Sequence, residues 1–72
     1  MKLTQAKEGQ EYVIDSIDIN DADLNSFLFT LGCYSGESIT LIKRRKSGCI
    51  IVIKDGRYSI DSRLADTITV RA

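Results

Sequence analysis

The segment Leu31–Arg45 reads LGCYSGESITLIKRR and contains the sharpest change of pattern in the chain. Its two glycines bracket a polar corner, and after the corner Ile39 and Leu41 alternate with polar residues as in a half-buried β-strand. Gly32 suits the left-handed position after a helix, and Gly36 suits the third position of a type II turn, where φ is positive. The segment therefore predicts a helix end, a glycine-dependent corner and a strand.

A short amphipathic helix is predicted before the corner. Its apolar positions follow the i, i+3, i+4, i+7 spacing of one helical face and are Leu24, Phe27, Leu28 and Leu31. Asn20 or Asp21 can cap its first turn. Before the helix, the segment Glu11–Ile19 is rich in β-branched residues, and its apolar parity switches near Asp15 and Ser16. Such a switch is typical of a β-bulge where a strand bends around a small barrel.

Short strands separated by turns make up the rest of the chain. Lys46–Gly48 and Asp55–Gly56 are predicted to be hairpin turns, and the strong Asp-Gly signal gives Gly56 a structural role. A half-turn at Asp61–Asp66 leads to the last strand. The strands predicted after the corner are Ser38–Arg45, Cys49–Lys54, Arg57–Ile60 and Thr67–Arg71. With the first strand they predict a mainly β fold, a small antiparallel barrel of about five strands with one short helix.

The length and the charge balance limit the class of protein. Seventy-two residues suffice for one domain, which we expect to span residues 1–72. Ten basic and ten acidic side chains balance, so no overall field attracts nucleic acid or anionic lipid. The start at Met1 lacks the apolar core of a secretory signal, and no apolar run approaches the ~20 residues of a membrane span. We therefore expect a cytoplasmic protein with reduced thiols and no insertion into a membrane.

The inventory of reactive side chains argues against an enzyme. The chain has no histidine, so no Ser-His, Cys-His or His-metal centre can form, and two cysteines are too few for a structural zinc site. Cys33 follows a predicted helix C-terminus, whose negative end disfavours the thiolate. Cys49 begins an apolar strand and is expected to pack in the core. No catalytic residue and no cofactor are therefore predicted.

Acidic residues before and inside the helix raise the question of a metal site. Asp21, Asp23 and Asn25 imitate the opening of an EF-hand loop. Ser26 and Gly32, however, stand where a calcium loop needs glycine and glutamate. Helix capping explains these acids better. A weak ferrous iron site is a further alternative, and its carboxylates would be Asp15, Asp18, Asp21 and Asp23.

A basic run is the first candidate for partner binding. Its members, which could contact phosphates, are Lys43, Arg44, Arg45 and Lys46. On a strand, at most two of these four side chains share a face, and the run leads to a hairpin tip where cations are usually solvated. No cluster of exposed aromatic residues accompanies it to stack on bases. Protection of a sheet edge is therefore favoured over nucleic-acid binding.

The uninterrupted apolar run Cys49–Ile53 is the second candidate. One parity of this run can fill the barrel, whereas Ile50 and Val52 then need a separate cover. We favour the amphipathic helix as that cover. Without it, an apolar strip would remain on the surface as a docking site for a partner protein, enlarged by Phe29 and Tyr34.

With these features in place, the chain resembles the family of ferrous iron transport protein A (FeoA). The family's signature is leucine-glycine, two residues, proline-glycine and then alternating apolar residues, which corresponds to LGCYSGESITLI here. Leu3 and Gly9, the hairpin segment Ile51–Gly56 and the closing segment Leu64–Val70 also correspond to the family pattern. Ser35 stands where the family commonly has proline, and proline is expected to stabilise the turn by roughly 0.4–1 kcal/mol.

The resemblance implies an SH3-like barrel in the cytoplasm that supports a large membrane GTPase and permease for ferrous iron (FeoB-like). Similar barrels form the carboxy-terminal domain of metal-dependent repressors of the diphtheria toxin repressor type. The implied partner is the cytoplasmic part of the transporter, and no agreed metal ligands or contact residues carry over. The alternative is a nucleic-acid-binding barrel that uses residues 43–46. The sequence leaves open whether the transporter is activated or inhibited, which face docks, the oligomeric state and direct iron binding.

Overall fold

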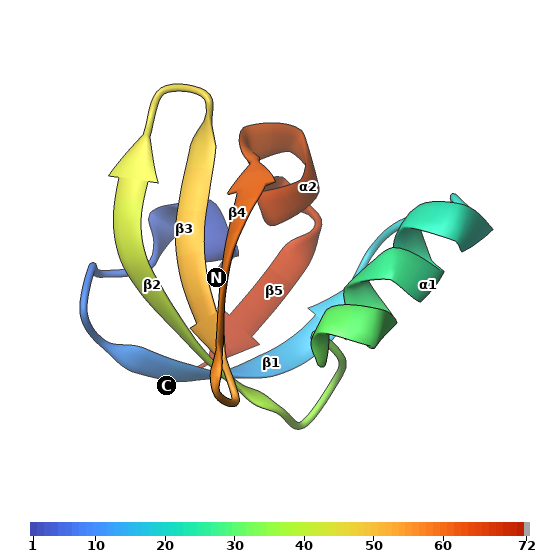
Figure 1. Cartoon of the computed structure of the whole chain (residues 1–72), viewed down its shortest axis with the longest axis horizontal. Helices are drawn as coiled ribbons and strands as arrows, with labels where there is room; N and C mark the ends of the chain where they lie inside the picture. Colours follow the sequence, from blue (N-terminus) through green and yellow to red (C-terminus); the bar gives the residue numbers. More distant parts are fainter. Residues whose placement is uncertain (72) are drawn as a thin grey trace.

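Five strands and two helices follow one another in the computed structural model, which describes residues 1–71 (Figure 1). A single 3₁₀ turn, Leu3–Gln5, comes first. The elements are then β1 (Glu11–Ile17), α1 (Ala22–Leu31), β2 (Ser38–Arg45), β3 (Gly48–Ile53), β4 (Gly56–Asp61), α2 (Ser62–Asp66) and β5 (Ile68–Arg71). Neighbouring strands are antiparallel and form one sheet in the order β4-β3-β2-β1-β5. The predicted mainly β fold is confirmed.

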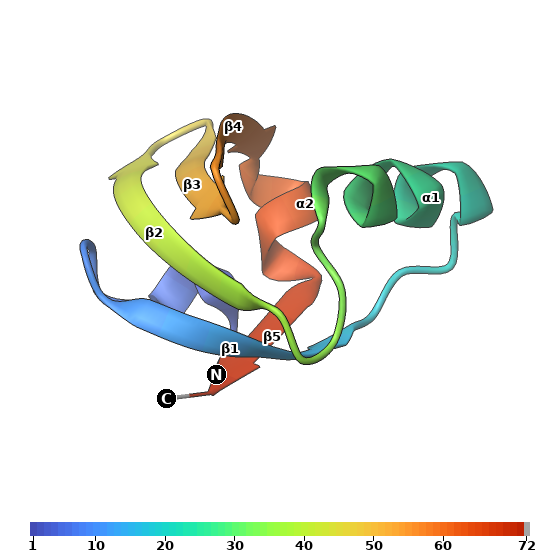
Figure 2. The same ribbon diagram turned by 60° about the horizontal axis from the view of Figure 1, so that its bottom comes forward.

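The sheet curls because two of its ladders contain bulges. The pairing of β1 with β5 shifts register between Ile14 and Ser16, where the sequence predicted a bulge. A second shift occurs between Leu41 and Lys43, in the ladder of β2 with β3. Bulges bend a strand and increase its twist. Figure 2 shows the result, with β1, β2 and β3 curved around a common interior.

The interior of the curled sheet is apolar. Inward-pointing residues include Ile68 and Val70 of β5, as the sequence predicted. Cys33 and Cys49 are also buried there as free thiols. The buried core consists of Leu3, Ala6, Tyr12, Ile14, Leu28, Cys33, Ile39, Leu41, Cys49, Ile51, Ile53, Ile60, Ala65, Ile68 and Val70. Because no charged or polar residue within residues 1–71 is buried among them, hydrophobic burial is the main stabilising contribution.

The corner between α1 and β2 depends on two glycines with a left-handed backbone. Gly32 ends α1 and Gly36 lies in the following turn, each with a φ of 93°. The amide of Glu37 donates to the carbonyl of Tyr34 at 3.1 Å, which closes the predicted four-residue turn. The amide of Gly36 also donates to the carbonyl of Ile14 at 2.8 Å. The corner is therefore tied to β1.

The hairpin between β3 and β4 corrects the prediction for Gly56. Ile53 pairs with Gly56, so the two-residue loop consists of Lys54 and Asp55, and Gly56 already belongs to β4. Lys54 takes the left-handed conformation, with a φ of 55°. A Cβ on Gly56 would collide with the ring of Tyr58. The glycine is needed for the close approach of that ring, whereas the turn itself uses the two preceding residues.

The segment predicted as a half-turn contains a second helix, α2. Asp61 caps this helix by accepting a hydrogen bond of 2.7 Å from the amide of Leu64. Ala65 is fully buried, and α2 packs against β3, β4 and the amino-terminal 3₁₀ turn. Helix α2, capped by Asp61 and anchored in the core by Ala65, closes one end of the barrel.

Helix α1 does not cover the outer face of β3, which corrects the favoured prediction. Within Ala22–Leu31, Leu28 is buried and Leu31 is half-buried, while the other residues are exposed. Both views place α1 at the end of β1, away from the outer face of β2 and β3 (Figure 1 and Figure 2), and Figure 2 shows it next to α2. Ile50 and Val52 therefore stay partly exposed on that outer face.

Candidate docking surface

An aromatic cluster forms where α1 ends and the β3–β4 hairpin approaches it. The rings of Phe29 and Tyr34 lie 4.9 Å apart between centroids, at an interplanar angle of 34°. Lys54 Nζ lies 5.4 Å from the centroid of the Tyr34 ring and donates a hydrogen bond of 3.1 Å to its Oη. Contact between aromatic rings and cation–π contact each stabilise such a cluster beyond the contribution of buried apolar area. We call Phe29, Tyr34 and Lys54 the aromatic ledge.

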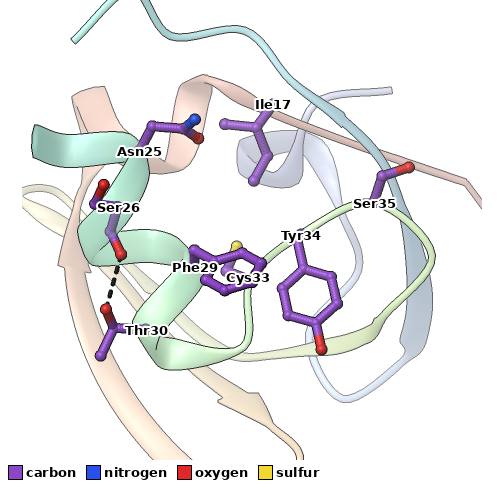
Figure 3. Close-up of a pocket in the computed structure, with 8 residues that line it drawn as sticks. All are labelled: Ile17, Asn25, Ser26, Phe29, Thr30, Cys33, Tyr34 and Ser35. Atoms are coloured by element: carbon purple, nitrogen blue, oxygen red, sulfur yellow. Dashed lines mark hydrogen bonds between the residues drawn. The ribbon is translucent and has the colours of Figure 1, made fainter. Parts of the chain in front are cut away.

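Two shallow hollows border the aromatic ledge. Figure 3 shows the first, with the rings of Phe29 and Tyr34 side by side and the hydroxyl of Thr30 donating to the carbonyl of Ser26 at 2.8 Å. The residues around this hollow are Ile17, Asn25, Ser26, Phe29, Thr30, Cys33, Tyr34 and Ser35. The second hollow lies toward the hairpin, where Tyr58 adds another ring. Both can receive an apolar or aromatic side chain of a partner.

Lys54 and the two cysteines have raised pKa values. The hydrogen bond to Tyr34 raises the pKa of Lys54, so this side chain is a cation at neutral pH. Burial raises the pKa of the Cys33 thiol to about 11. Burial also raises the pKa of Cys49, against the opposing effect of the nearby Arg44 guanidinium. Both thiols are therefore protonated at neutral pH, whereas a nucleophilic cysteine needs a lowered pKa.

The basic run 43–46 does not form one contact surface. The Nε of Arg44 donates to the carbonyl of Thr4 at 2.8 Å, and its Nη2 donates to the carbonyl of Ala6. The backbone amide of Arg44 donates to Glu8 Oε2 at 2.7 Å. Arg44 is exposed like the other members of the run, which are Lys43, Arg45 and Lys46. Arg44 thus fastens the amino-terminal segment to β2, which removes a central cation from the nucleic-acid alternative.

The apolar strip on the outer face of β3 is narrow. Ile50 and Val52 are both half-buried. Residues directly opposite each other on antiparallel strands share a face of the sheet, and here these neighbours are Thr40, Lys43, Arg57 and Ser59. The strip is therefore bordered by polar and charged side chains on both sides and offers little continuous apolar area.

The residues predicted for partner binding fall in three separate places: the aromatic ledge, the outer face of β3 and the β2–β3 hairpin. Lys54 was not among the predicted residues, because it reaches Tyr34 across 20 positions of the chain. Leu24 and Phe27 were predicted to lie on the helix face that covers β3, yet they are 42% and 49% exposed. Helical spacing identifies residues that share a face but carries no signal for whether that face is covered.

The acidic residues before and inside α1 do not converge on a metal site. Asp21 caps α1 by accepting hydrogen bonds from the amides of Asp23 and Leu24. A carboxylate oxygen of Asp15 lies 3.6 Å from Arg71 Nε. Within residues 1–71, no three Cys, Asp or Glu side chains come close enough together to hold an ion. The iron-carrier alternative therefore has no preformed set of ligands.

The curled five-stranded barrel, with α1 inserted between β1 and β2, matches several solved structures. An iron uptake regulatory protein, FeoA, aligns with a TM-score of 0.87 at 22% identity, over 99% of this chain and 95% of that one. The FeoA of Stenotrophomonas maltophilia, an SH3 domain protein complexed with zinc, aligns with a TM-score of 0.83 at 17% identity, over 97% of this chain and 88% of that one. A manganese-dependent transcriptional repressor gives 0.90 at 16% identity; the match covers 100% of this chain and 41% of the repressor. The class of protein is therefore a small SH3-like barrel.

The chain also matches the family model of the FeoA domain over residues 1–72. It belongs to the FeoA family, which is associated with ferrous iron transport. The resemblance seen in the sequence is thus confirmed. A comparison with curated proteins gave no match. None of the helices within residues 1–71 has the length and apolar character needed to cross a membrane.

Proposed function

We propose that this chain is a small cytoplasmic accessory protein that binds the cytoplasmic part of a ferrous iron transporter with a GTPase domain (FeoB-like) and modulates its activity. The family match over residues 1–72 carries the proposal. It is supported by three large apolar side chains exposed on α1, which are Leu24, Phe27 and Phe29. Leu24 and Phe27 lie on one side of α1, and Phe29 stacks with Tyr34 on another. Exposed apolar side chains grouped in this way mark sites of protein contact.

The accessory role relies on binding and needs no catalytic step. The sequence contains no histidine, and burial raises the pKa of both Cys33 and Cys49. The aromatic ledge offers ring faces and one cation, which suit recognition of another protein better than proton or group transfer. We therefore expect the chain to act on the transporter by occupying a site on it.

Direct binding to the transporter tests this proposal. The immobilised chain is offered the purified cytoplasmic domain of a ferrous iron transporter, with GDP and with a non-hydrolysable GTP analogue. We expect saturable binding at micromolar concentration or below. Absence of binding with either nucleotide, to the isolated domain and to the full-length transporter in detergent, contradicts the proposal. Labelled DNA and RNA serve as controls, and tight binding to them that weakens steeply with salt would favour the nucleic-acid alternative.

A further inference from the structure

An apolar groove lies between α1 and α2. Leu24 of α1, Leu64 of α2 and Ile19 of the segment before α1 line a hollow of about 370 Å³. Phe27 is three positions beyond Leu24, so the two side chains lie on the same side of α1. Figure 2 shows the two helices next to each other, in agreement with their shared hollow. We call this hollow, lined by Ile19, Leu24 and Leu64, together with the adjacent exposed side chain of Phe27, the helix groove.

The two apolar side chains that α1 contributes to the helix groove, Leu24 and Phe27, are not needed to hold α1 in place. Within Ala22–Leu31, Leu28 alone is fully buried, and Leu31 is half-buried beside it. Leu24 and Phe27 are 42% and 49% exposed, so polar residues at these positions would leave the core intact. Apolar side chains that face water next to an apolar hollow are a feature of interaction sites. The helix groove therefore has the properties of a docking site.

The surroundings of the helix groove are acidic, and this sign identifies the chemistry of the partner. From residue 8 to residue 42 the sequence has seven acidic residues and no basic one. Three of these acids are exposed near the first turn of α1, namely Asp18, Asp21 and Asp23. On the α2 side, Asp61 and the cation Arg63 both line the hollow. Asp61 and Arg63 offset each other in the lining of the hollow. The negative charge beside the groove therefore comes from the exposed acids Asp18, Asp21 and Asp23, which flank Ile19 and Leu24 in the sequence, and it attracts a basic partner.

We propose that the helix groove binds a basic amphipathic helix of a partner protein. Its apolar stripe packs against Leu24, Phe27 and Leu64, and its flanking Lys and Arg side chains face the acidic rim. An apolar stripe inserted in an apolar groove is a general mode of helix recognition, and the charges set orientation and association rate. Assigning this helix to the transporter rests on the proposed function. Suitable transporter segments lie next to membrane spans, because short cytoplasmic loops are rich in Lys and Arg.

A designed peptide tests the chemical preference of the helix groove. The peptide is a fluorescent amphipathic helix of about 18 residues with leucine on one face and Lys and Arg on both flanks. The control peptide has Glu in place of every Lys and Arg. By fluorescence anisotropy, we expect the basic peptide to bind at least about tenfold more tightly than the control, with weaker binding at higher salt. Equal affinities, or no binding of the basic peptide at micromolar concentration, overturn the proposal.

Two phenylalanines of α1 form a matched pair of variants. Phe27 belongs to the helix groove, whereas Phe29 lies about 200° further around the helix and belongs to the aromatic ledge. Phe27→Ser should weaken binding of the basic peptide at least about tenfold, and Phe29→Ser should change it by less than about twofold. Both side chains are exposed, so both variants should fold, which circular dichroism checks. Equal effects of the two variants, or a larger effect of Phe29→Ser, overturn the assignment to this groove.

Two further measurements separate the competing explanations. If sedimentation of the protein alone shows a dimer that Phe27→Ser dissociates, a second copy occupies the helix groove and the proposal is overturned. A monomer supports it. If Phe27→Ser leaves binding to the transporter unchanged, the assignment of the transporter contact to the helix groove is refuted, while the proposed function stands. If the native chain binds the basic peptide through Phe27 but does not bind the transporter, the proposed function fails while the helix groove stands.

Discussion

Ser35 occupies the second position of the turn that joins α1 to β2, and its side chain is engaged. Its Oγ donates a hydrogen bond of 2.9 Å to the carbonyl of Asp15. Proline at this position would restrict the unfolded chain and thereby stabilise the folded protein by about 0.4–1 kcal/mol. It would also remove this hydrogen bond, which is worth about 0.5–1.5 kcal/mol. We therefore expect Ser35→Pro to change the free energy of unfolding by less than about 0.5 kcal/mol, measured by urea unfolding.

Ser35→Ala is the matched control for this prediction. It removes the hydrogen bond to Asp15 without restricting the unfolded chain, so we expect it to lower the free energy of unfolding by about 1 kcal/mol. A gain in stability of about 0.5–1 kcal/mol for Ser35→Pro would show that the hydrogen bond contributes nothing. The hydrogen bond of Ser35 therefore reduces the gain in stability that the sequence alone predicts for proline at this position.

Cys33 makes stability depend on pH in the alkaline range. Burial raises the pKa of its thiol from 9.0 to about 11, so the folded state holds the proton more tightly than the unfolded state. The contribution to stability is fully present below pH 9.0 and is lost as the pH rises toward about 11. Between pH 8 and pH 10.5, denaturant unfolding should show a loss of about 2 kcal/mol from this group.

Comparison with Cys33→Ala isolates the effect of the thiol from other groups that titrate in the same range. The variant should be less stable at pH 8 because it leaves a small cavity in the core. Its loss of stability between pH 8 and pH 10.5 should, however, be smaller than that of the native chain by about 2 kcal/mol. Identical pH profiles for the two proteins would mean that Cys33 is not buried as described.

Among the structural elements, β2 shows how a charged strand end can serve the fold. Arg44 donates to the carbonyls of Thr4 and Ala6 and thereby holds the amino-terminal segment against β2. Leu3 and Ala6 of that segment are buried in the core. We expect Arg44→Met to lower the free energy of unfolding by about 1–2 kcal/mol, because hydrogen bonds from a charged donor are lost. Urea unfolding measures this.

Arg45→Met is the control for the Arg44 prediction, since it removes a neighbouring exposed cation. We expect it to change stability by no more than about 0.5 kcal/mol. If the run instead served to bind nucleic acid, Arg44→Met and Arg45→Met would both weaken binding to DNA or RNA, and neither would change the free energy of unfolding. Equal stabilities of the two variants would therefore show that Arg44 does not fasten the amino-terminal segment.

Across the molecule as a whole, stability is expected to be uneven. The barrel strands share one apolar core, whereas α1 contributes a single fully buried residue to it, Leu28. A helix of ten residues is too short to be stable by itself in water. We expect the amides of α1 to exchange with deuterium at least about tenfold faster than those of β2 and β3, as measured by NMR.

Leu28→Ala extends the exchange prediction. It should accelerate exchange throughout α1 and leave β2 and β3 comparatively protected, provided that solution conditions keep the barrel folded. If α1 proves as well protected as the central strands, then the helix is held by more than Leu28 and does not open locally. A helix that opens locally is suited to adjust its position when a partner helix binds.

Several features of this chain follow from the sequence because they are properties of neighbouring residues. Alternation predicted the strands, the parity switch predicted the bulge between Ile14 and Ser16, and glycine placement predicted the left-handed Gly32 and Gly36. The short motifs also identified the FeoA family, which the match over residues 1–72 confirms. Periodicity and turn chemistry act over a few residues, so one sequence is enough to recognise them.

Tertiary structure alone decided which surfaces are left open. The pattern showed that Leu24 and Phe27 share a helix face with the buried Leu28 but not where the edge of the barrel would leave that face uncovered. The partners of Arg44 lie 36 to 40 positions away, and the contact between Lys54 and Tyr34 spans 20 positions. Such contacts depend on how the elements are placed relative to one another, because local periodicity determines which side chains share a face but not what that face meets.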